Sequence, residues 1–293
     1  LPLVAKGKVR DIYSIDENSL LFVATDRISA YDVIMENGIK DKGKILTQLS
    51  VFWFKFLSAS IKNHLIASED EEIFKLLPAE LSEPKYKDQL SGRSLIVKKH
   101  KLVPLEVIVR GYITGSAWKE YKKSGTVHGL KVEEGLQESQ KFPTPIFTPS
   151  TKAEQGEHDE NISPEAAAKL VGEELCTKLA AKAIELYSKA ADYAETKGII
   201  LADTKFEFGL DEEDNLVLVD EVLTPDSSRF WSKATFALGK SQDSYDKQFL
   251  RDWLTSNGLN GKEGVSMTED IATRSAEKYT EAFEALTGKK WVA

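Results

Sequence analysis

A run of alternating charged and apolar residues, Asp203-Thr204-Lys205-Phe206-Glu207-Phe208, offers the clearest chemistry in the chain. Side chains alternate across a β-strand, so Asp203, Lys205 and Glu207 are expected on one face and the uncharged residues on the core face. A polar stretch at 211–215 and an apolar run at 216–219 follow. Together they predict an antiparallel hairpin that ends at Asp220 and Glu221.

The clustered carboxylates of this hairpin predict a cation site. The second strand is almost wholly apolar, which is typical of burial on both faces. Partly buried carboxylates are costly unless they hold a cation or pair with lysine or arginine. Mg²⁺ prefers one or two carboxylates plus phosphate oxygens, so Glu207 and Asp220 are the expected ligands and Lys205 a phosphate contact. The competing interpretation is an amphipathic hairpin with a solvated charged face.

A shared metal places a condition on the register of the hairpin. With a five-residue turn, residue 210 pairs with 216, and Asp220 falls opposite Phe206 on the core face. A one-residue bulge would place Asp220 opposite Glu207 instead. The metal hypothesis therefore predicts a bulge or a slightly longer loop.

Three further segments combine polar side chains with turn-forming residues. Lys6-Gly7-Lys8-Val9-Arg10 is either a phosphate-covering turn or an exposed basic end, and it is not a Walker loop. The segment 25–32 either contacts a phosphate or caps a turn. In 110–116, an arginine at a strand end precedes two glycines, which suits a bound phosphate or a tight structural turn. A similar polar cluster, at 226–229, contains Asp226, Ser228 and Arg229.

Other patterns exclude whole classes of function. His158 has no paired histidine at zinc-binding spacing, and no G-x-S-x-G motif occurs. The net charge of −8 disfavours nucleic-acid binding. No apolar run is long enough for a membrane span, and no signal peptide is expected at the start. Because no methionine precedes Leu1, a few residues are expected before it. The one cysteine, Cys176, fits a reducing compartment and a core thiol.

The elements that must position these residues suggest about two domains. Short strands are expected between residues 8 and 110, with one helix at 45–57. The connection 98–104 is expected to be a hinge, and 124–163 a long loop. Helices are expected at 164–172, with Ser163 as N-cap, and then up to about 197, at 245–254 and at 269–286.

Six segments taken together resemble the phosphoribosylaminoimidazole-succinocarboxamide synthase (SAICAR synthetase) family, in its single-function fungal-like form. They cover most of the chain from residue 6 to about 255. In order they are GKVRDIY (7–13), ATDRISAYDVIM (24–35), PLEVIVRGYITGSAWKEY (104–121), FTPSTKAEQGEHDENIS (147–163), ADTKFEFG (202–209) and VDEVLTPDSSRFW (219–231).

This resemblance implies an α+β fold of two lobes with antiparallel sheets, similar to kinases and ATP-grasp enzymes, with ATP in the cleft between them. The lobes would be 1–101 and 102–293. The implied activity joins L-aspartate to carboxyaminoimidazole ribonucleotide (CAIR) with ATP and Mg²⁺, through an acyl phosphate, in purine biosynthesis. A cytoplasmic location is implied, a monomer is favoured, and neither nucleic acid nor membrane is an expected partner.

The resemblance also assigns roles to individual residues. ATP would contact Lys6, Gly7, Lys8, Val9, Arg10, Lys98, His100, Leu102, Glu106 and Lys205. The other substrates would contact Ser29, Asp32, Arg110, Ser116, Lys152, His158, Asp159, Ser228 and Arg229. Glu207 and Asp220 would hold the metal, Lys205 would neutralise the transferred phosphoryl group, and Asp203 or Asp226 would be the base. A kinase acting on a hydroxyl, or a nucleotide-binding regulator without catalysis, are the alternatives, although no H-R-D or D-F-G motif supports the kinase.

Overall fold

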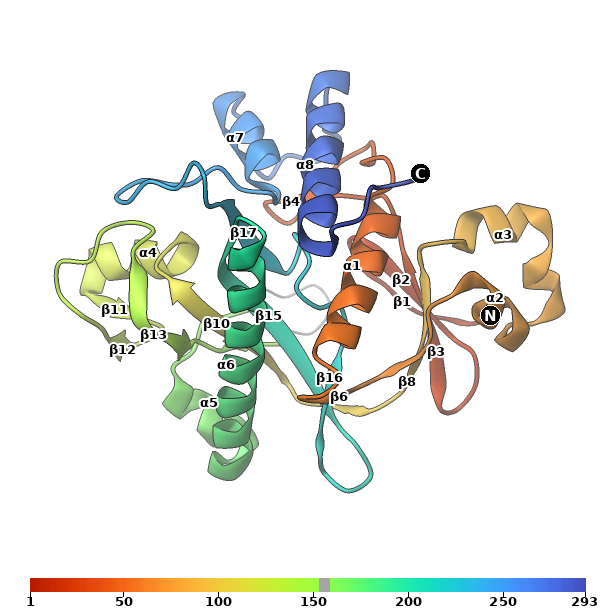
Figure 1. Ribbon diagram of the computed structural model, residues 1–293, viewed down its shortest axis with the longest axis horizontal. Coiled ribbons are helices and arrows are strands. Elements are labelled where there is room, and N and C mark those ends of the chain that lie inside the picture. Colours follow the sequence, from red (N-terminus) through yellow and green to blue (C-terminus); the bar gives the residue numbers. More distant parts are fainter. Residues whose placement is uncertain (153–158) are drawn as a thin grey trace. The chain divides into compact units, whose positions relative to one another are not determined.

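The computed structural model describes residues 1–152 and 159–293, and these residues cluster into two compact units. Unit 1 contains Leu1–His100, Thr224–Asp226 and Asp246–Ala293, and unit 2 contains Lys101–Leu223 and Ser227–Tyr245. Each unit combines helices with an antiparallel sheet, so the predicted α+β class is confirmed (Figure 1). The boundary between the two units after His100 falls within 98–104, the segment that was expected to connect two domains. The C-terminal residues, however, belong to unit 1 rather than to the lobe 102–293.

Unit 1 is built on a sheet whose strands follow the order β1-β2-β3-β8-β7. Its apolar residues point to both faces: Leu21 and Val23 pack with Ile73 and Leu77, whereas Phe22 packs with neighbours on the opposite side. The elements of this unit are β1 (Leu3–Lys6), β2 (Arg10–Ser14), β3 (Ser19–Ala24), β4 (Ser29–Ala30), β5 (Val33–Ile34), α1 (Lys42–Phe56), β6 (Lys62–Asn63), β7 (Leu65–Ala67), α2 (Asp70–Leu76), the 3₁₀ helix η1 (Ala79–Ser82), α3 (Pro84–Leu90), β8 (Ser94–Lys98), α7 (Gln248–Ser256) and α8 (Glu269–Thr287).

Helices α1 and α8 pack against each other in unit 1, although more than two hundred residues separate them in the chain (Figure 1). The expected helices at 45–57 and 269–286 are confirmed by these two elements. Thr268 caps α8, since its side chain accepts a hydrogen bond from the amide of Ile271. The short helices α2, α3 and η1 were not predicted, because each is too short to show a clear apolar period.

Unit 2 is built on a sheet in the order β13-β10-β15-β16, with β14 also paired to β10, and β9 and β17 to β15. Its elements are β9 (Lys101–Leu102), β10 (Leu105–Tyr112), α4 (Gly115–Ser124), β11 (Thr126–Val127), β12 (Leu130–Lys131), β13 (Lys141–Phe147), β14 (Ser150–Thr151), α5 (Pro164–Val171), α6 (Glu173–Thr196), β15 (Ile199–Leu210), β16 (Leu216–Val219) and β17 (Ser228–Ser232). Helix α6 lies along β10 and β15 and buries Leu179, Leu186 and Ala190 (Figure 1).

The expected long loop at 124–163 is wrong in part, because it contains four strands. Strand β13 carries Pro143 and Pro145, which suggested a loop. Proline cannot donate a ladder hydrogen bond, but an edge strand tolerates it on its outer side. Strand β13 is at the end of the sheet order, next to β10 alone. The N-cap at Ser163 is confirmed, since its side chain accepts from the amide of Ala166.

The hairpin of β15 and β16 has the simple register, in which Leu210 pairs with Leu216 and Glu207 pairs with Val219. The predicted bulge between these strands is therefore wrong. Strand β16 ends at Val219, and Asp220 takes a left-handed backbone conformation with φ of 67°. A change of chain direction, rather than an extra residue in the ladder, sets the position of Asp220. Across the described residues, no helix is long and apolar enough to cross a membrane.

Candidate active site

The charged face of β15 in unit 2 gathers most of the predicted catalytic residues. Thr204, Phe206 and Phe208 are buried, as the alternation predicted, whereas Lys205 and Glu207 are only partly buried. Strand β10 runs antiparallel beside β15, with Arg110 opposite Asp203. Strand β17 pairs with residues 199–204 of β15 and places Arg229 opposite the same Asp203.

Asp203 forms ion pairs with two arginines. Nη1 of Arg229 lies 2.6 Å from Oδ2 of Asp203, and Nη1 of Arg110 lies 3.5 Å from the same oxygen. Arg110 is 3% exposed, and burial lowers its pKa to about 10, an effect that Asp203 opposes and Arg229 reinforces. Two guanidinium groups on one carboxylate leave a net positive charge, which suits an anionic ligand.

Three other side chains surround the guanidinium of Arg110. Its Nε donates to Oγ1 of Thr148 at 3.0 Å, and its Nη2 donates to Oγ of Ser116 at 3.3 Å. The same Nη2 lies 3.1 Å from Nε2 of His128. The sequence grouped Arg110 with Ser116 correctly, but it gave no role to His128.

Lys205 and Glu106 form a partly buried ion pair, with Nζ 2.7 Å from Oε1. Burial by itself would lower the pKa of Lys205, but the carboxylates of Glu106, Glu207 and Asp220 outweigh it and raise that pKa. Burial raises the pKa of Glu106, and Lys205 opposes this rise. Direct contact with an ammonium group keeps the pair ionised near neutral pH. Lys205 is therefore a fixed positive charge on this face.

Glu207 and Asp220, the two predicted metal ligands, lie close enough for the charge of Asp220 to act on Glu207. Burial, followed by the negative charge of Asp220, raises the pKa of Glu207, while Lys152 and Lys205 lower it. A salt bridge joins Lys152 to Glu207. Among residues 1–152 and 159–293, no cluster of three or more acidic, histidine or cysteine side chains forms a metal site. Two neighbouring carboxylates suffice for Mg²⁺ when substrate phosphates and water complete its coordination, so the donor set fits this ion.

The segment after the undescribed residues also reaches this face. Oγ of Ser116 accepts a hydrogen bond from Nδ2 of Asn161 at 3.1 Å. Asp159 lies close enough for its charge to raise the pKa of Glu106. Lys152 and Asp159 thus adjoin the Glu106–Glu207 region, whereas His158 lies outside the described residues.

Ser228 does not lie on the charged face. It pairs with Thr204 in the ladder, and the hydroxyl oxygens of these two residues are 2.7 Å apart. Both residues are nearly inaccessible, at 5% and 1% exposure. The prediction that Ser228 contacts substrate is therefore not supported, because the strand alternation that exposes Arg229 turns Ser228 to the core.

In unit 1, the basic segment 6–10 forms the turn between β1 and β2. The amide of Gly7 donates to the carbonyl of Arg10 at 2.8 Å, and a Cβ on Gly7 would come within 2.9 Å of that oxygen. Arg27 donates to the carbonyls of Gly7 and Lys8 and pairs with Asp11. These contacts hold the segment in an ordered turn, in which Lys6, Gly7 and Lys8 are exposed.

Ser29 and Asp32 lie in the two-residue hairpin of β4 and β5, in unit 1. Tyr31 and Asp32 form its turn with φ of 50° and 64°. Such values are costly for residues other than glycine and often mark functional sites. Asp32 is held by Nζ of Lys8 at 2.5 Å, so the two predicted segments of unit 1 are joined directly.

Asp226 belongs to a buried cluster of unit 1. Its carboxylate lies 2.8 Å from Nζ of Lys42 and 3.7 Å from Nζ of Lys247, and it accepts a hydrogen bond from Oη of Tyr279 at 2.5 Å. Burial would raise its pKa, but Lys247, Lys42 and Tyr279 outweigh burial and hold it well below its ordinary value. A weakly basic, enclosed carboxylate is a poor proton acceptor, so the predicted role as base does not fit.

The predicted adenine contacts are divided between the units. Lys98 ends β8 and His100 follows it in unit 1, while Leu102 and Glu106 lie on β9 and β10 in unit 2. Leu102 is 52% exposed and pairs with Gly209.

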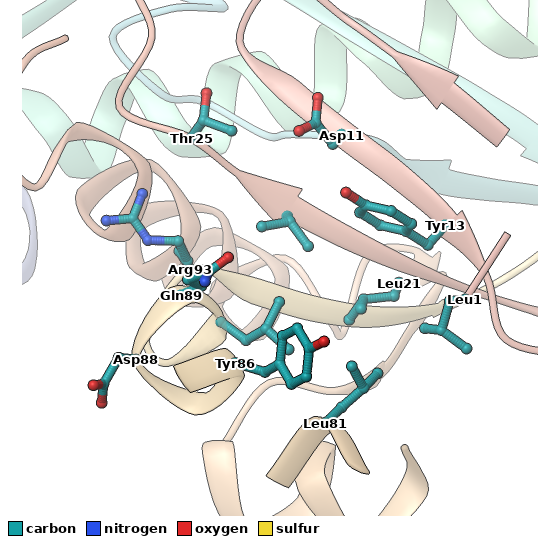
Figure 2. A pocket seen from close by; sticks show the side chains of 12 residues that line it. Leu1, Asp11, Tyr13, Leu21, Thr25, Leu81, Tyr86, Asp88, Gln89 and Arg93 are labelled. Carbon is teal, nitrogen blue, oxygen red and sulfur yellow. The ribbon is translucent and has the colours of Figure 1, made fainter. Parts of the chain in front are cut away.

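A separate cavity of about 630 Å³ lies in unit 1, between strands β2 and β3 and the segment containing η1 and α3 (Figure 2). Figure 2 shows Tyr13 and Leu21 on the strand side, and Leu81 and Tyr86 on the helical side. None of the predicted ligand-binding residues lines it. This cavity therefore does not coincide with the predicted ligand site.

Comparison with known proteins identifies the family of the chain. The model of the family described as SAICAR synthetase matches residues 3–268. A phosphoribosylaminoimidazole-succinocarboxamide synthase from Pichia angusta is 78% identical over 291 residues, covering 99% of this chain and 96% of the relative. A solved SAICAR-synthase from Saccharomyces cerevisiae, complexed with SAICAR, is 67% identical with a TM-score of 0.94, covering 100% of this chain and 97% of that one. A SAICAR synthetase (type 2) structure in complex with ADP is 28% identical with a TM-score of 0.69, covering 100% of each chain. The chain therefore belongs to the SAICAR synthetase family.

Proposed function

We propose that this chain is an ATP-dependent ligase that forms an amide between L-aspartate and CAIR, giving SAICAR, ADP and phosphate in purine biosynthesis. Family membership over nearly the whole chain supports this reaction. The single observation that carries it is the set of four ion pairs along β15. Asp203 meets two arginines, Lys205 meets Glu106, and Glu207 meets Lys152.

The chemistry of the substrates explains why ATP is needed. A carboxylate is a poor acyl donor, because its leaving group would be oxide. Transfer of the γ-phosphoryl group to a carboxylate oxygen of CAIR releases ADP and gives an acyl phosphate. The amine of aspartate then attacks the acyl carbon, phosphate leaves, and the nitrogen loses a proton. Catalysis of both steps depends mainly on positioning and on charge neutralisation.

Arg110 and Arg229 are the residues proposed to hold the anionic groups of CAIR, and Ser116 to orient them. The net positive charge around Asp203 supports this assignment. By similarity, Ser29 and Asp32 would contact the same substrate. Lys152 and Asp159 would approach it from the chain on either side of residues 153–158.

ATP phosphates are assigned to the turn 6–10, chiefly through Lys8 and Arg10. Lys205 is proposed to neutralise the transferred phosphoryl group, which its raised pKa supports, because the ammonium form persists near neutral pH. Glu106 would hold Lys205 in place. Lys98, His100 and Leu102 remain proposed nucleotide contacts.

Mg²⁺ is assigned to Glu207 and Asp220. When bound, it would neutralise phosphate charge and help to orient the phosphates. Burial and the negative charge of Asp220 raise the pKa of Glu207. A nearby cation would stabilise the ionised form of Glu207 by offsetting the repulsion between the two carboxylates. The salt bridge from Lys152 supplies a positive charge of this kind to Glu207.

We also propose that the enzyme acts in the cytoplasm, as a monomer that binds neither nucleic acid nor membrane. The net charge of −8 and the single, buried cysteine Cys176 support this proposal.

An omission experiment tests the reaction. Purified protein is mixed with Mg-ATP, L-aspartate and CAIR, each left out in turn, and the product is followed by absorbance and mass. Product that needs all three substrates is expected. ATP consumption without aspartate would favour a kinase, and no turnover by folded protein would favour a regulator.

Matched variants then test the site. Glu207→Gln and Lys205→Ala should each abolish most of the turnover. Glu174→Gln and Lys178→Ala, which alter an exposed ion pair on α6, should not. Equal activity in both sets would contradict the assignment of the site to this face of β15.

A further inference from the structure

His128 occupies the turn of a tight hairpin in unit 2. Strands β11 and β12 pair Val127 with Leu130, so His128 and Gly129 alone form the turn, with φ of 47° and 73°. The turn requires φ above zero at both positions, which is unfavourable for histidine. His128 is nevertheless only 2% exposed. A polar ring that is buried in this way must find hydrogen-bond partners inside the protein.

Glu120 of helix α4 fixes this turn. Its carboxylate accepts the amide of His128 at 2.6 Å, the amide of Gly129 at 3.0 Å and the hydroxyl of Thr126 at 3.0 Å. Burial would raise the pKa of Glu120, but these hydrogen bonds outweigh it and lower that pKa. An ionised Glu120 therefore clamps the hairpin to α4, the helix that also contains Ser116.

The neighbours of the His128 ring determine which nitrogen carries the proton. Nδ1 lies 2.9 Å from the carbonyl oxygen of Pro149, an acceptor only, so Nδ1 must donate. Nε2 lies 3.1 Å from Nη2 of Arg110, a donor only, so Nε2 must accept. Both hydrogen bonds form only when the ring is neutral and protonated on Nδ1.

The charged groups that face the ring favour this neutral form. Arg110 lies on β10 and Glu120 on α4. The backbone of Pro149 and of Ile162 also contacts the ring. Burial, followed by the charge of Arg110, lowers the pKa of His128 below its ordinary 6.5, although Glu120 and the backbone contacts oppose this. Arg110 therefore keeps a hydrogen-bond acceptor at physiological pH.

We propose that His128 is a positioning residue, whose neutral ring holds the guanidinium of Arg110 in place to bind the nucleotide substrate. A second proton on the ring would put an N–H against Nη2 of Arg110, so substrate affinity is lost on the acid side. The identity of that substrate rests on the function proposed above. Thr148 contacts Nε of Arg110 and Asp203 contacts Nη1, while Ser116 shares Nη2 with His128 at the longer distance of 3.3 Å.

Calorimetric titration with SAICAR tests this role without turnover. Wild type, His128→Gln and His128→Leu are compared at pH 8 and at mildly acidic pH, with His64→Gln as the control. His64 is a buried histidine of unit 1 that packs on Phe22 and Phe54. Glutamine can still accept from Arg110 but cannot titrate, whereas leucine removes the acceptor. A parallel NMR spectrum of the imidazole nitrogens reports the tautomer.

Wild type should bind SAICAR more weakly at acidic pH, and His128→Gln should lose less affinity over the same interval. The nucleotide phosphate also titrates near pH 6, so the difference between the two proteins isolates His128. His128→Leu should bind about tenfold more weakly at both pH values, as expected for loss of a charge-assisted hydrogen bond. The control should follow wild type, and maximal turnover at saturating substrate should change little in His128→Gln.

Either of two binding results would overturn the inference alone: the same pH dependence in wild type and His128→Gln, or wild-type affinity in folded His128→Leu. An Nε2-protonated ring in the NMR spectrum would do the same. If wild type does not bind SAICAR at all, the proposed function fails, and this inference fails with it.

Discussion

Nζ of Lys42 lies 2.8 Å from Oδ2 of Asp226, and the two side chains are 0% and 3% exposed. This ion pair joins α1 to the segment 224–226, which unit 1 takes from the middle of the chain. Removing Lys42 leaves the buried Asp226 with the more distant Lys247, at 3.7 Å, so Lys42→Met should lower the free energy of unfolding by up to about 3 to 5 kcal/mol. Urea denaturation measures this. Adding Asp226→Asn to Lys42→Met should recover part of the lost stability. If the double variant loses as much stability as the two single variants added together, the two residues are not coupled.

Acid should weaken the same ion pair. The pKa of Asp226 is depressed in the folded chain, so its stabilisation is complete above the ordinary value of 3.8 and is lost as pH falls below it. The difference in unfolding free energy between wild type and Asp226→Asn should therefore shrink on acidification. Urea midpoints at several pH values from neutral to strongly acidic measure it. A constant difference would exclude Asp226 as the responsible group.

Arg229 should contribute to binding of CAIR rather than to the chemical step. Arg229→Ala removes one of two guanidinium groups at Asp203, so KM for CAIR should rise about 10- to 100-fold, with kcat within about threefold. Steady-state kinetics with saturating ATP and aspartate measure this. Arg274→Ala, which removes an exposed arginine of α8, should leave both constants unchanged. A fall in kcat alone would move Arg229 from binding to catalysis.

Glu106 and Lys205 should act as one unit. Lys205→Ala should lower kcat by about 10²- to 10³-fold, as for loss of a preorganised charge, and Glu106→Gln by less, since the ammonium group remains. Because Glu106 acts through Lys205, the double variant should be no slower than Lys205→Ala. Single-turnover kinetics test this. Multiplied losses would show that Glu106 has a separate function.

Gly111 should tolerate no side chain. A Cβ there would lie 1.8 Å from Oη of Tyr187, which donates to the carbonyl of Leu201 at 2.7 Å. Gly111→Ala should cost about 1 to 3 kcal/mol through overpacking, visible as a lower Tm. Adding Tyr187→Phe removes the clashing oxygen and should restore part of that loss. No recovery would place the strain in the backbone instead.

Local patterns predicted the long helices and the hairpin of β15 and β16, but missed the short helices and the strands within 124–163. Contacts between distant segments could not be predicted. The alternation of residues 203–208 is confirmed, because it depends only on the conformation of a single strand, β15. The ion pair of Arg110 with Asp203 joins residues 93 positions apart, and only strand pairing brings them together. His128 was missed for the same reason. The dipeptide His128-Gly129 between β-prone residues is a signal of a two-residue β-hairpin turn, and it could have predicted β11 and β12.

Polar residues that are neighbours in the sequence do not always form one site, as the segment 226–229 shows. Asp226 is enclosed by lysines of unit 1, Ser228 faces the core beside Thr204, and Arg229 lies on the charged face beside Asp203. A chain reversal and the alternation of β17 separate three residues that lie within four positions. Their identities indicated polar contacts, but not which contacts each would make.

The composition of unit 1 also determines the order in which the chain can fold during synthesis. Unit 2 has all of its residues once Tyr245 has left the ribosome, whereas unit 1 needs α8, which ends at Thr287. Until then, the face of α1 that packs on α8 has no partner, and its apolar side chains remain open to other chains. The first unit to begin synthesis is thus the last to have all of its residues, and its N-terminal part waits longest for its packing partner.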